Sequence, residues 1–155
     1  MKYNDIEVKL KELSVFLNGK EKVEINHVVN MHDVPFIGDR TDENLHGIPY
    51  PPSSDLSTKS GIYLFCKEDG EVLYIGKATE NNIRNRIFDH LKTPEASDIQ
   101  GWVTYPKNQF NDNLVKEGKV KVGIYEVKPA KYSSLVEVYL QTIVEELPEF
   151  CKRIG

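Results

Sequence analysis

Several side chains suited to phosphate chemistry fall within one stretch of this 155-residue chain, residues 60–91. They are Tyr63, Tyr74, Lys77, Arg84, Arg86 and His90. Phosphodiester hydrolysis needs a positioned water, a group that takes its proton and cations that stabilise the developing charge. An arginine can bind two phosphate oxygens at once, and a tyrosine becomes a base only where nearby cations lower its pKa. The stretch therefore indicates a phosphate-directed site.

The first two elements that must position these side chains are a pair of strands. Gly61-Ile62-Tyr63 opens the first strand, and Tyr74-Ile75-Gly76 ends the second. Between them, Glu68-Asp69-Gly70 is a turn signal, because Asp-Gly supplies the positive φ that a tight hairpin needs. The pattern predicts an antiparallel hairpin with Tyr63 and Tyr74 on neighbouring strands.

A helix is predicted after the hairpin, because Ile83, Ile87 and Leu91 recur at every fourth position. At about 100° per residue, Arg86 and His90 share one flank of this apolar stripe, one turn apart. Both side chains would then project toward the open face of the hairpin. Arg84 falls on the other side of the helix, where it is structural or a peripheral phosphate contact.

Both triplets, and the ten residues between them, resemble the GIY-YIG nuclease domain family. This fold occurs in homing endonucleases, in some restriction enzymes and in the N-terminal part of one component of the excision-repair nuclease. The resemblance runs from about Ser60 to Pro148, and Lys77-Ala78 after the second triplet is similar to the repair-type members. It implies a DNA endonuclease that uses a single divalent metal, Mg²⁺ or Mn²⁺.

The resemblance also implies a role for each matching residue. Tyr63 corresponds to the tyrosine proposed as general base or water-positioner, and Tyr74 to the second active-site tyrosine. Arg86 matches the arginine taken to stabilise the transition state, and His90 matches a residue that contacts phosphate or assists proton transfer. Glu137, on a predicted late helix, matches the metal-binding glutamate.

Substrate contacts are expected from three further residues, Gly76, Lys77 and Arg84. One position departs from the family pattern, because no asparagine follows Pro148. This departure and the acidic balance, a net charge of −4, favour an alternative function. In that alternative, the chain keeps the GIY-YIG fold but is a non-catalytic DNA-binding or protein-interaction module.

The N-terminal segment, residues 1–59, lies outside the resemblance. A helix is predicted to begin at Asn4 as N-cap, with Ile6, Leu10, Leu13 and Leu17 at helical spacing. A short strand is expected within residues 20–29, followed by a long loop rich in Pro, Gly and Ser. The segment could bind a protein partner, bind DNA or support the sheet. Its histidines lack the spacing of a zinc site and are expected to be surface residues.

Composition supports a globular protein with 39% hydrophobic and 28% charged residues. No apolar run is long enough for a membrane span, and the N-terminus is too polar for a secretory signal, so no membrane contact and a cytoplasmic location are expected. The two cysteines, Cys66 and Cys151, form no disulfide framework. Because phosphate neutralisation dominates affinity for DNA, an acidic chain should bind DNA weakly and in a salt-sensitive way.

The fold expected is α/β (α+β): a small, three-stranded, mainly antiparallel sheet flanked by helices. Its third strand is predicted over residues 119–127 and its last helix over residues 131–147. Two units are predicted, a helix-and-loop extension over residues 1–59 and a GIY-YIG nuclease-like domain over residues 60–155. The function expected is metal-dependent DNA cleavage in a repair, restriction or mobile-element context.

Overall fold

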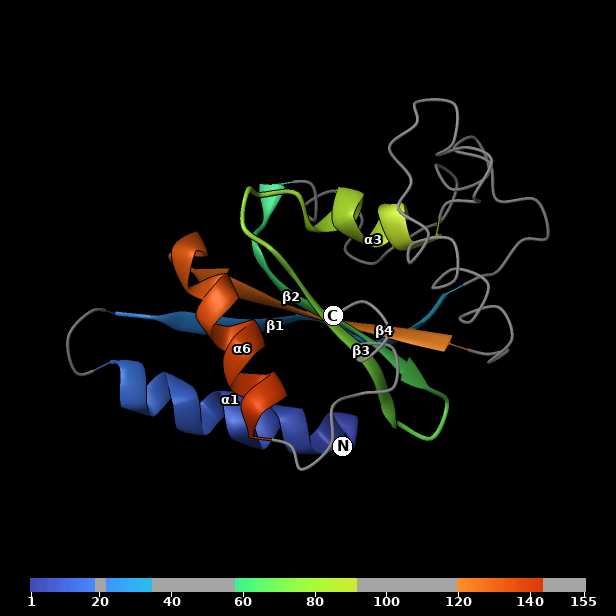
Figure 1. Cartoon of the computed structure of the whole chain (residues 1–155), viewed down its shortest axis with the longest axis horizontal. Coiled ribbons are helices and arrows are strands. Elements are labelled where there is room, and N and C mark those ends of the chain that lie inside the picture. Colours follow the sequence, from blue (N-terminus) through green and yellow to red (C-terminus); the bar gives the residue numbers. More distant parts are fainter. Residues whose placement is uncertain (19–21, 35–57, 92–119, 144–155) are drawn as a thin grey trace.

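A single antiparallel sheet with helices on both faces forms the framework of the protein (Figure 1). The computed structural model describes residues 1–18, 22–34, 58–91 and 120–143. Their elements are α1 (Tyr3–Leu17), β1 (Glu24–Val34), β2 (Gly61–Lys67), β3 (Val72–Ala78), α3 (Ile83–Leu91), β4 (Val120–Lys128), the 3₁₀ helix η2 (Ala130–Tyr132) and α6 (Ser133–Thr142). The α+β class expected from the sequence is confirmed.

The sheet has four strands in the order β1-β4-β2-β3, so the expectation of three strands is wrong by one. The additional strand is β1, which pairs antiparallel with β4 from Glu24↔Lys128 to Val34↔Val120. Two irregularities, between His27 and Val29 and between Val29 and His32, shift its register. Each irregularity interrupts the alternation of inward and outward side chains, and this alternation is the sequence signal for a strand.

The predicted hairpin is formed by β2 and β3, which pair from Gly61↔Ala78 to Cys66↔Val72. Gly70 has a φ of 87°, the left-handed conformation that the Asp-Gly turn requires. The backbone N–H of Gly70 donates to the Lys67 carbonyl (2.9 Å), and the Asp69 carboxylate accepts from the N–H of Glu71 (2.9 Å). These two hydrogen bonds within the turn stabilise its conformation.

The helix α1 begins at Tyr3, earlier than the Asn4 cap expected from the sequence. Lys2 is the N-cap, and its backbone N–H donates to the Asp5 carboxylate (3.2 Å). The cause is a tertiary contact, because the N–H of Tyr3 donates to the carbonyl of Gly70 (2.7 Å) in the hairpin turn. This contact with a distant turn fixes where the helix starts.

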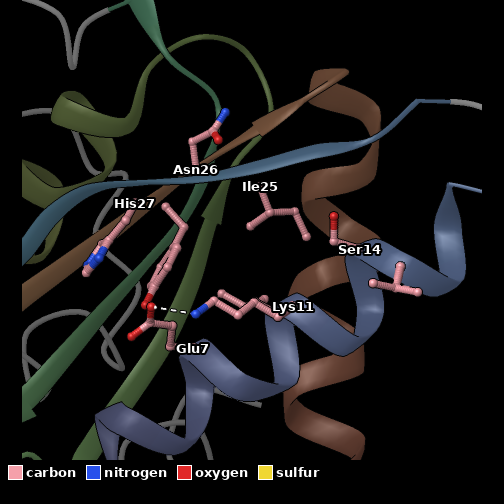
Figure 2. A pocket seen from close by; sticks show the side chains of 9 residues that line it. Glu7, Lys11, Ser14, Ile25, Asn26 and His27 are labelled. Atoms are coloured by element: carbon pink, nitrogen blue, oxygen red, sulfur yellow. Dashed lines mark ion pairs between the residues drawn. The ribbon is translucent and has the colours of Figure 1, made fainter.

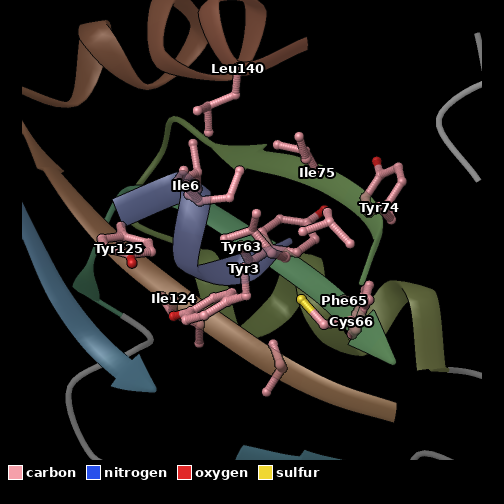
Figure 3. Packing of buried hydrophobic residues seen from close by; sticks show 14 of the residues in the cluster. Tyr3, Ile6, Tyr63, Phe65, Cys66, Tyr74, Ile75, Ile124, Tyr125 and Leu140 are labelled. Atoms are coloured by element: carbon pink, nitrogen blue, oxygen red, sulfur yellow. The ribbon is translucent and has the colours of Figure 1, made fainter. Parts of the chain in front are cut away.

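A large part of the core lies between α1, α6 and one face of the sheet (Figure 3). The predicted apolar stripe of α1 is confirmed at Ile6, Leu10 and Leu13, which are buried. Leu140 of α6 joins the same cluster, and α1 contacts α6 directly. In Figure 1, α3 lies on the other side of the sheet from these two helices.

The last two helices follow their predicted apolar patterns within the described residues. In α3, Ile83 and Ile87 are completely buried. In α6, Val136 and Leu140 are completely buried, and the helix ends at Thr142. Predictions for residues 92–119 and 144–155, among them the position of Pro148, lie outside the described residues. No helix in the described part of the chain is long and apolar enough to cross a membrane.

Candidate active site

The hairpin places Tyr63 directly across from Gly76 on the neighbouring strand. Tyr63 is completely buried, and its ring covers the α-carbon of the glycine. A Cβ at Gly76 would lie 2.6 Å from the Tyr63 hydroxyl oxygen, a distance that real side chains do not adopt. The second triplet therefore needs glycine at this position so that the phenol of the first triplet can lie over the edge strand β3.

The glycine of the first triplet, Gly61, is also needed because the backbone of a neighbouring strand lies close to it. It stands opposite Glu126 of β4, and a Cβ there would collide with the carbonyl oxygen of Tyr125. Its N-terminal neighbour Ser60 is buried, and the Ser60 hydroxyl accepts a hydrogen bond from the backbone N–H of Asn81 (2.7 Å). This bond ties the start of β2 to the segment before α3, and so helps to position that helix.

Tyr63 lies in an aromatic group on one face of the hairpin. Its ring centroid is 6.0 Å from that of Phe65 and 6.1 Å from that of Tyr74. Burial, together with the nearby Tyr74, raises the pKa of the Tyr63 phenol well above its usual value of 10, although the Arg86 charge acts in the opposite direction. Glu137 raises this pKa further. The phenol is therefore neutral at physiological pH.

These influences on the Tyr63 pKa show that the predicted residues converge from different elements. Tyr74 comes from β3, Arg86 from α3 and Glu137 from α6, and each lies within electrostatic reach of Tyr63. The two helices lie on opposite sides of the sheet. Among the described strands, β3 is at one edge of the sheet, and it carries Tyr74, Gly76 and Lys77.

Lys77 and Glu137 form an ion pair at the same edge. The Lys77 Nζ lies 2.8 Å from Oε2 of Glu137, and the Glu137 side chain is only 15% exposed while that of Lys77 is 40% exposed. Lys77 stands opposite Ile62 and follows Gly76, so it points to the face of the sheet away from Tyr63. Both residues are predicted for one site by the family resemblance, but no sequence pattern indicates that they pair with each other.

For two predicted residues of α3, the described contacts do not test a place in this group. Arg84 is half-buried, and it is not among the residues that influence the pKa of Tyr63. His90 is part of α3, but its side chain lies outside the described residues. The described contacts link six of the predicted residues to one another, namely Tyr63, Tyr74, Gly76, Lys77, Arg86 and Glu137.

The donor set at this edge fits a single hydrated cation. Among the described residues there is no cluster of three or more His, Cys, Asp or Glu side chains that could form a protein-only cage. Mg²⁺ does not need one, because it keeps several waters and is held by one or two carboxylates together with substrate phosphates. The largely buried Glu137 carboxylate supplies one such oxygen ligand.

A pocket of about 360 Å³ lies on the other face of the sheet from Tyr63, between α1, β1 and β4 (Figure 2). Its polar lining includes Glu7 and Lys11 of α1, which form an ion pair (3.2 Å), and His27 of β1. None of the predicted site residues lines it. The pocket is therefore separate from the candidate active site.

His27 belongs to an aromatic group beside this pocket and is not an isolated surface histidine. Its ring stacks on Tyr125 (centroids 4.4 Å apart, 4° between planes), and its Nε2 lies 2.6 Å from the Tyr3 hydroxyl. Burial lowers the pKa of His27. The ring of Tyr3 covers Gly123 of β4, as Tyr63 covers Gly76. Sequence patterns could not reveal this group, because α1 meets β4 only in the folded protein.

Comparison with known proteins adds family information to this geometry. Residues 59–134 match the family model of the GIY-YIG catalytic domain. UvrABC system protein C of Carboxydothermus hydrogenoformans is 28% identical over 109 residues, which cover 61% of this chain and 17% of that protein. The same-named protein of Chlorobium phaeobacteroides is 27% identical over 104 residues, which cover 57% and 16%.

The chain thus spans about a sixth of the length of the curated relatives it matches. No solved structure matches it. The resemblance of the two triplets to the GIY-YIG family is confirmed for residues 59–134.

Proposed function

We propose, from the premise that residues 59–134 are a GIY-YIG domain, that the protein is a metal-dependent endonuclease that hydrolyses DNA phosphodiester bonds. The observation that supports this proposal is that Arg86 of α3 and Glu137 of α6 both lie close enough to Tyr63 of β2 to influence its pKa. Three separate elements bring together a phenol, a guanidinium and a carboxylate. Phosphodiester hydrolysis needs this combination to orient water, to stabilise charge and to hold a metal ion.

In the proposed reaction, Tyr63 acts as a neutral phenol. Because its pKa is raised, its hydroxyl orients the attacking water by hydrogen bonding and does not act as a phenolate base. Tyr74, whose ring is 6.1 Å from that of Tyr63, contributes a second hydroxyl that orients water or phosphate. This assignment selects the water-positioning role from the two roles that the family resemblance implies for Tyr63.

Cationic side chains hold the phosphate in this scheme. Arg86 binds phosphate oxygens and stabilises the charge that develops on them, as its planar fork of donors allows. Lys77 contributes a second positive charge from the edge strand. Glu137 would hold the Mg²⁺ or Mn²⁺ ion, whose chemistry is to neutralise charge on the phosphate oxygens. His90 and Arg84 remain candidates for further phosphate contacts.

A DNA-repair context is the one that the comparisons favour. Both curated relatives are named UvrABC system protein C, and the family match includes the residues proposed here for catalysis up to position 134. With a net charge of −4, this chain should bind DNA weakly and in a salt-sensitive way when it is alone. DNA is therefore proposed as the substrate, with affinity supplied in part by other chains.

A second candidate function is a protein-interaction module that uses the N-terminal segment. It is favoured by Val15 and Phe16 of α1, whose side chains are 79% and 82% exposed although both are apolar. Exposed apolar side chains next to each other are typical of surfaces that bind another protein. The two functions are compatible, because Val15 and Phe16 lie near the C-terminal end of α1, whereas the contact of α1 with the β2–β3 hairpin is made at its N-terminal end, where the N–H of Tyr3 donates to the carbonyl of Gly70.

The experiment that tests the endonuclease proposal is nicking of supercoiled plasmid DNA in Mg²⁺ or Mn²⁺. Cleavage is expected with either metal and none is expected in EDTA. Branched and damaged DNA should be offered in parallel, because a repair nuclease can require a particular structure. Failure to cleave any of these substrates would contradict the proposal and leave the interaction module as the better explanation.

A further inference from the structure

The Lys77–Glu137 ion pair occupies the carboxylate on which the proposed function depends. At 2.8 Å, the Lys77 ammonium takes up Oε2 of Glu137 in a direct charge-assisted hydrogen bond. A divalent cation at the same carboxylate would stand beside a like charge. The two cations therefore cannot share Glu137 without a large electrostatic cost.

The two partners differ in how easily they can move. The Glu137 side chain is 15% exposed and belongs to α6, a helix with a buried apolar face that fixes its position. The Lys77 side chain is 40% exposed and carries its ammonium on a flexible four-carbon stem. Lys77 is therefore the partner that leaves when another cation arrives.

We infer that Lys77 and the divalent metal compete for Glu137, and that metal binding releases the Lys77 ammonium to a DNA phosphate. This inference rests on the proposed function and describes how the same site is regulated. Without metal, the ion pair neutralises both groups and holds the carboxylate in place. With metal and DNA together, each group has a new partner of opposite charge.

Such an exchange couples the binding of the metal to the binding of DNA. A phosphate that attracts Lys77 away from Glu137 makes the carboxylate available to metal, and metal that displaces Lys77 makes the ammonium available to phosphate. By thermodynamic linkage, DNA must raise the affinity for metal by the same factor as metal raises the affinity for DNA. Lys77 is a positioning residue in this scheme as well as a phosphate contact.

The direct test measures Mn²⁺ binding to the full chain without DNA, by electron paramagnetic resonance of the free ion. The variants are Lys77→Met, Lys77→Arg and Glu137→Gln. Because Lys77→Met removes both the ion pair and the like charge, it should bind Mn²⁺ about three- to tenfold more tightly than wild type. Lys77→Arg should stay near wild type, and Glu137→Gln should lose this binding.

A matched control is Lys67→Met, which also removes a strand lysine paired with a glutamate, Glu71 (3.7 Å), at the far end of the hairpin. It should leave Mn²⁺ affinity unchanged. If Lys77→Met binds Mn²⁺ no more tightly than wild type while Glu137→Gln loses binding, the competition is disproved and the metal site stands. If no variant binds Mn²⁺ without DNA, Lys77→Met included, the competition at Glu137 is disproved; if none binds Mn²⁺ with a DNA duplex either, the metal-dependent function fails as well.

A second measurement addresses the release of Lys77 to DNA. It uses the Tyr63→Phe background, in which cleavage should be too slow to consume the duplex, and compares Mn²⁺ affinity with and without a short DNA duplex. DNA should raise the affinity for Mn²⁺ more in the Tyr63→Phe protein, which keeps Lys77, than in the double variant Tyr63→Phe with Lys77→Met. Equal enhancement in both backgrounds would overturn the coupling through Lys77.

Discussion

The ring of Tyr63 lies over the α-carbon of Gly76, its partner across the hairpin. This relationship joins the two triplets physically, because the tyrosine of the first needs the missing side chain of the second. The Tyr63 hydroxyl lies over the edge strand β3 at a position where no Cβ blocks it.

Replacement of Gly76 by alanine should therefore displace Tyr63. Overpacking of a buried site costs about 1–3 kcal/mol of the free energy of unfolding, which urea denaturation would measure. The clash should be relieved when Tyr63 is shortened, so Tyr63→Leu combined with Gly76→Ala should cost less than the sum of the two single changes. Strict additivity would contradict the contact between these residues.

Tyr63→Phe should lower the rate of DNA nicking about a hundredfold, the order expected when one positioned hydrogen-bonding group is lost. Because burial raises the pKa of Tyr63 above 10, the phenol does not ionise near neutral pH. The variant should therefore keep the shape of the wild-type pH–rate profile between about pH 6 and 9. An ionisation in the wild-type profile that disappears in Tyr63→Phe would show that the phenolate is the base.

Two buried serines make a separate prediction about stability. The Ser133 hydroxyl at the start of α6 is buried and has no hydrogen-bond partner among the described residues, so Ser133→Ala should raise the free energy of unfolding by about 1 kcal/mol. Ser60→Ala should lower it by about 1 kcal/mol, because the Ser60 hydroxyl accepts from the Asn81 N–H. Thermal or urea unfolding measures both changes in the free energy of unfolding. A Ser133→Ala protein that is less stable than wild type would contradict the inference that the Ser133 hydroxyl is buried without a hydrogen-bond partner in the described part of the chain.

The hairpin and the positions of its two triplets could be predicted from sequence because their signals are local. The Asp-Gly turn sets the register, and the register places Tyr63 opposite Gly76. The stripe of Ile83 and Ile87 fixes the face of α3 and hence the flank that carries Arg86. Family resemblance was needed for Glu137, since nothing local distinguishes it from other glutamates of a late helix.

The features that the sequence did not predict arise from contacts between distant segments. The length of β1 was not predicted because its irregular register interrupts the alternating pattern of a strand. The start of α1 at Tyr3 was not predicted because it depends on a hydrogen bond to the hairpin turn. The Lys77–Glu137 pair joins residues on β3 and α6, and no pattern within either element indicates it. The division into residues 1–59 and 60–155, and the cytoplasmic location, stay predictions.

The most direct test of the central claim is a plasmid-nicking assay of Glu137→Gln against wild type in Mg²⁺ or Mn²⁺. Glu71→Gln is the matched control, because Glu71 is also paired with a lysine but lies at the other end of the hairpin. The account predicts that wild type and Glu71→Gln nick DNA and that Glu137→Gln does not. Nicking by Glu137→Gln at the wild-type rate would contradict a metal site at this carboxylate.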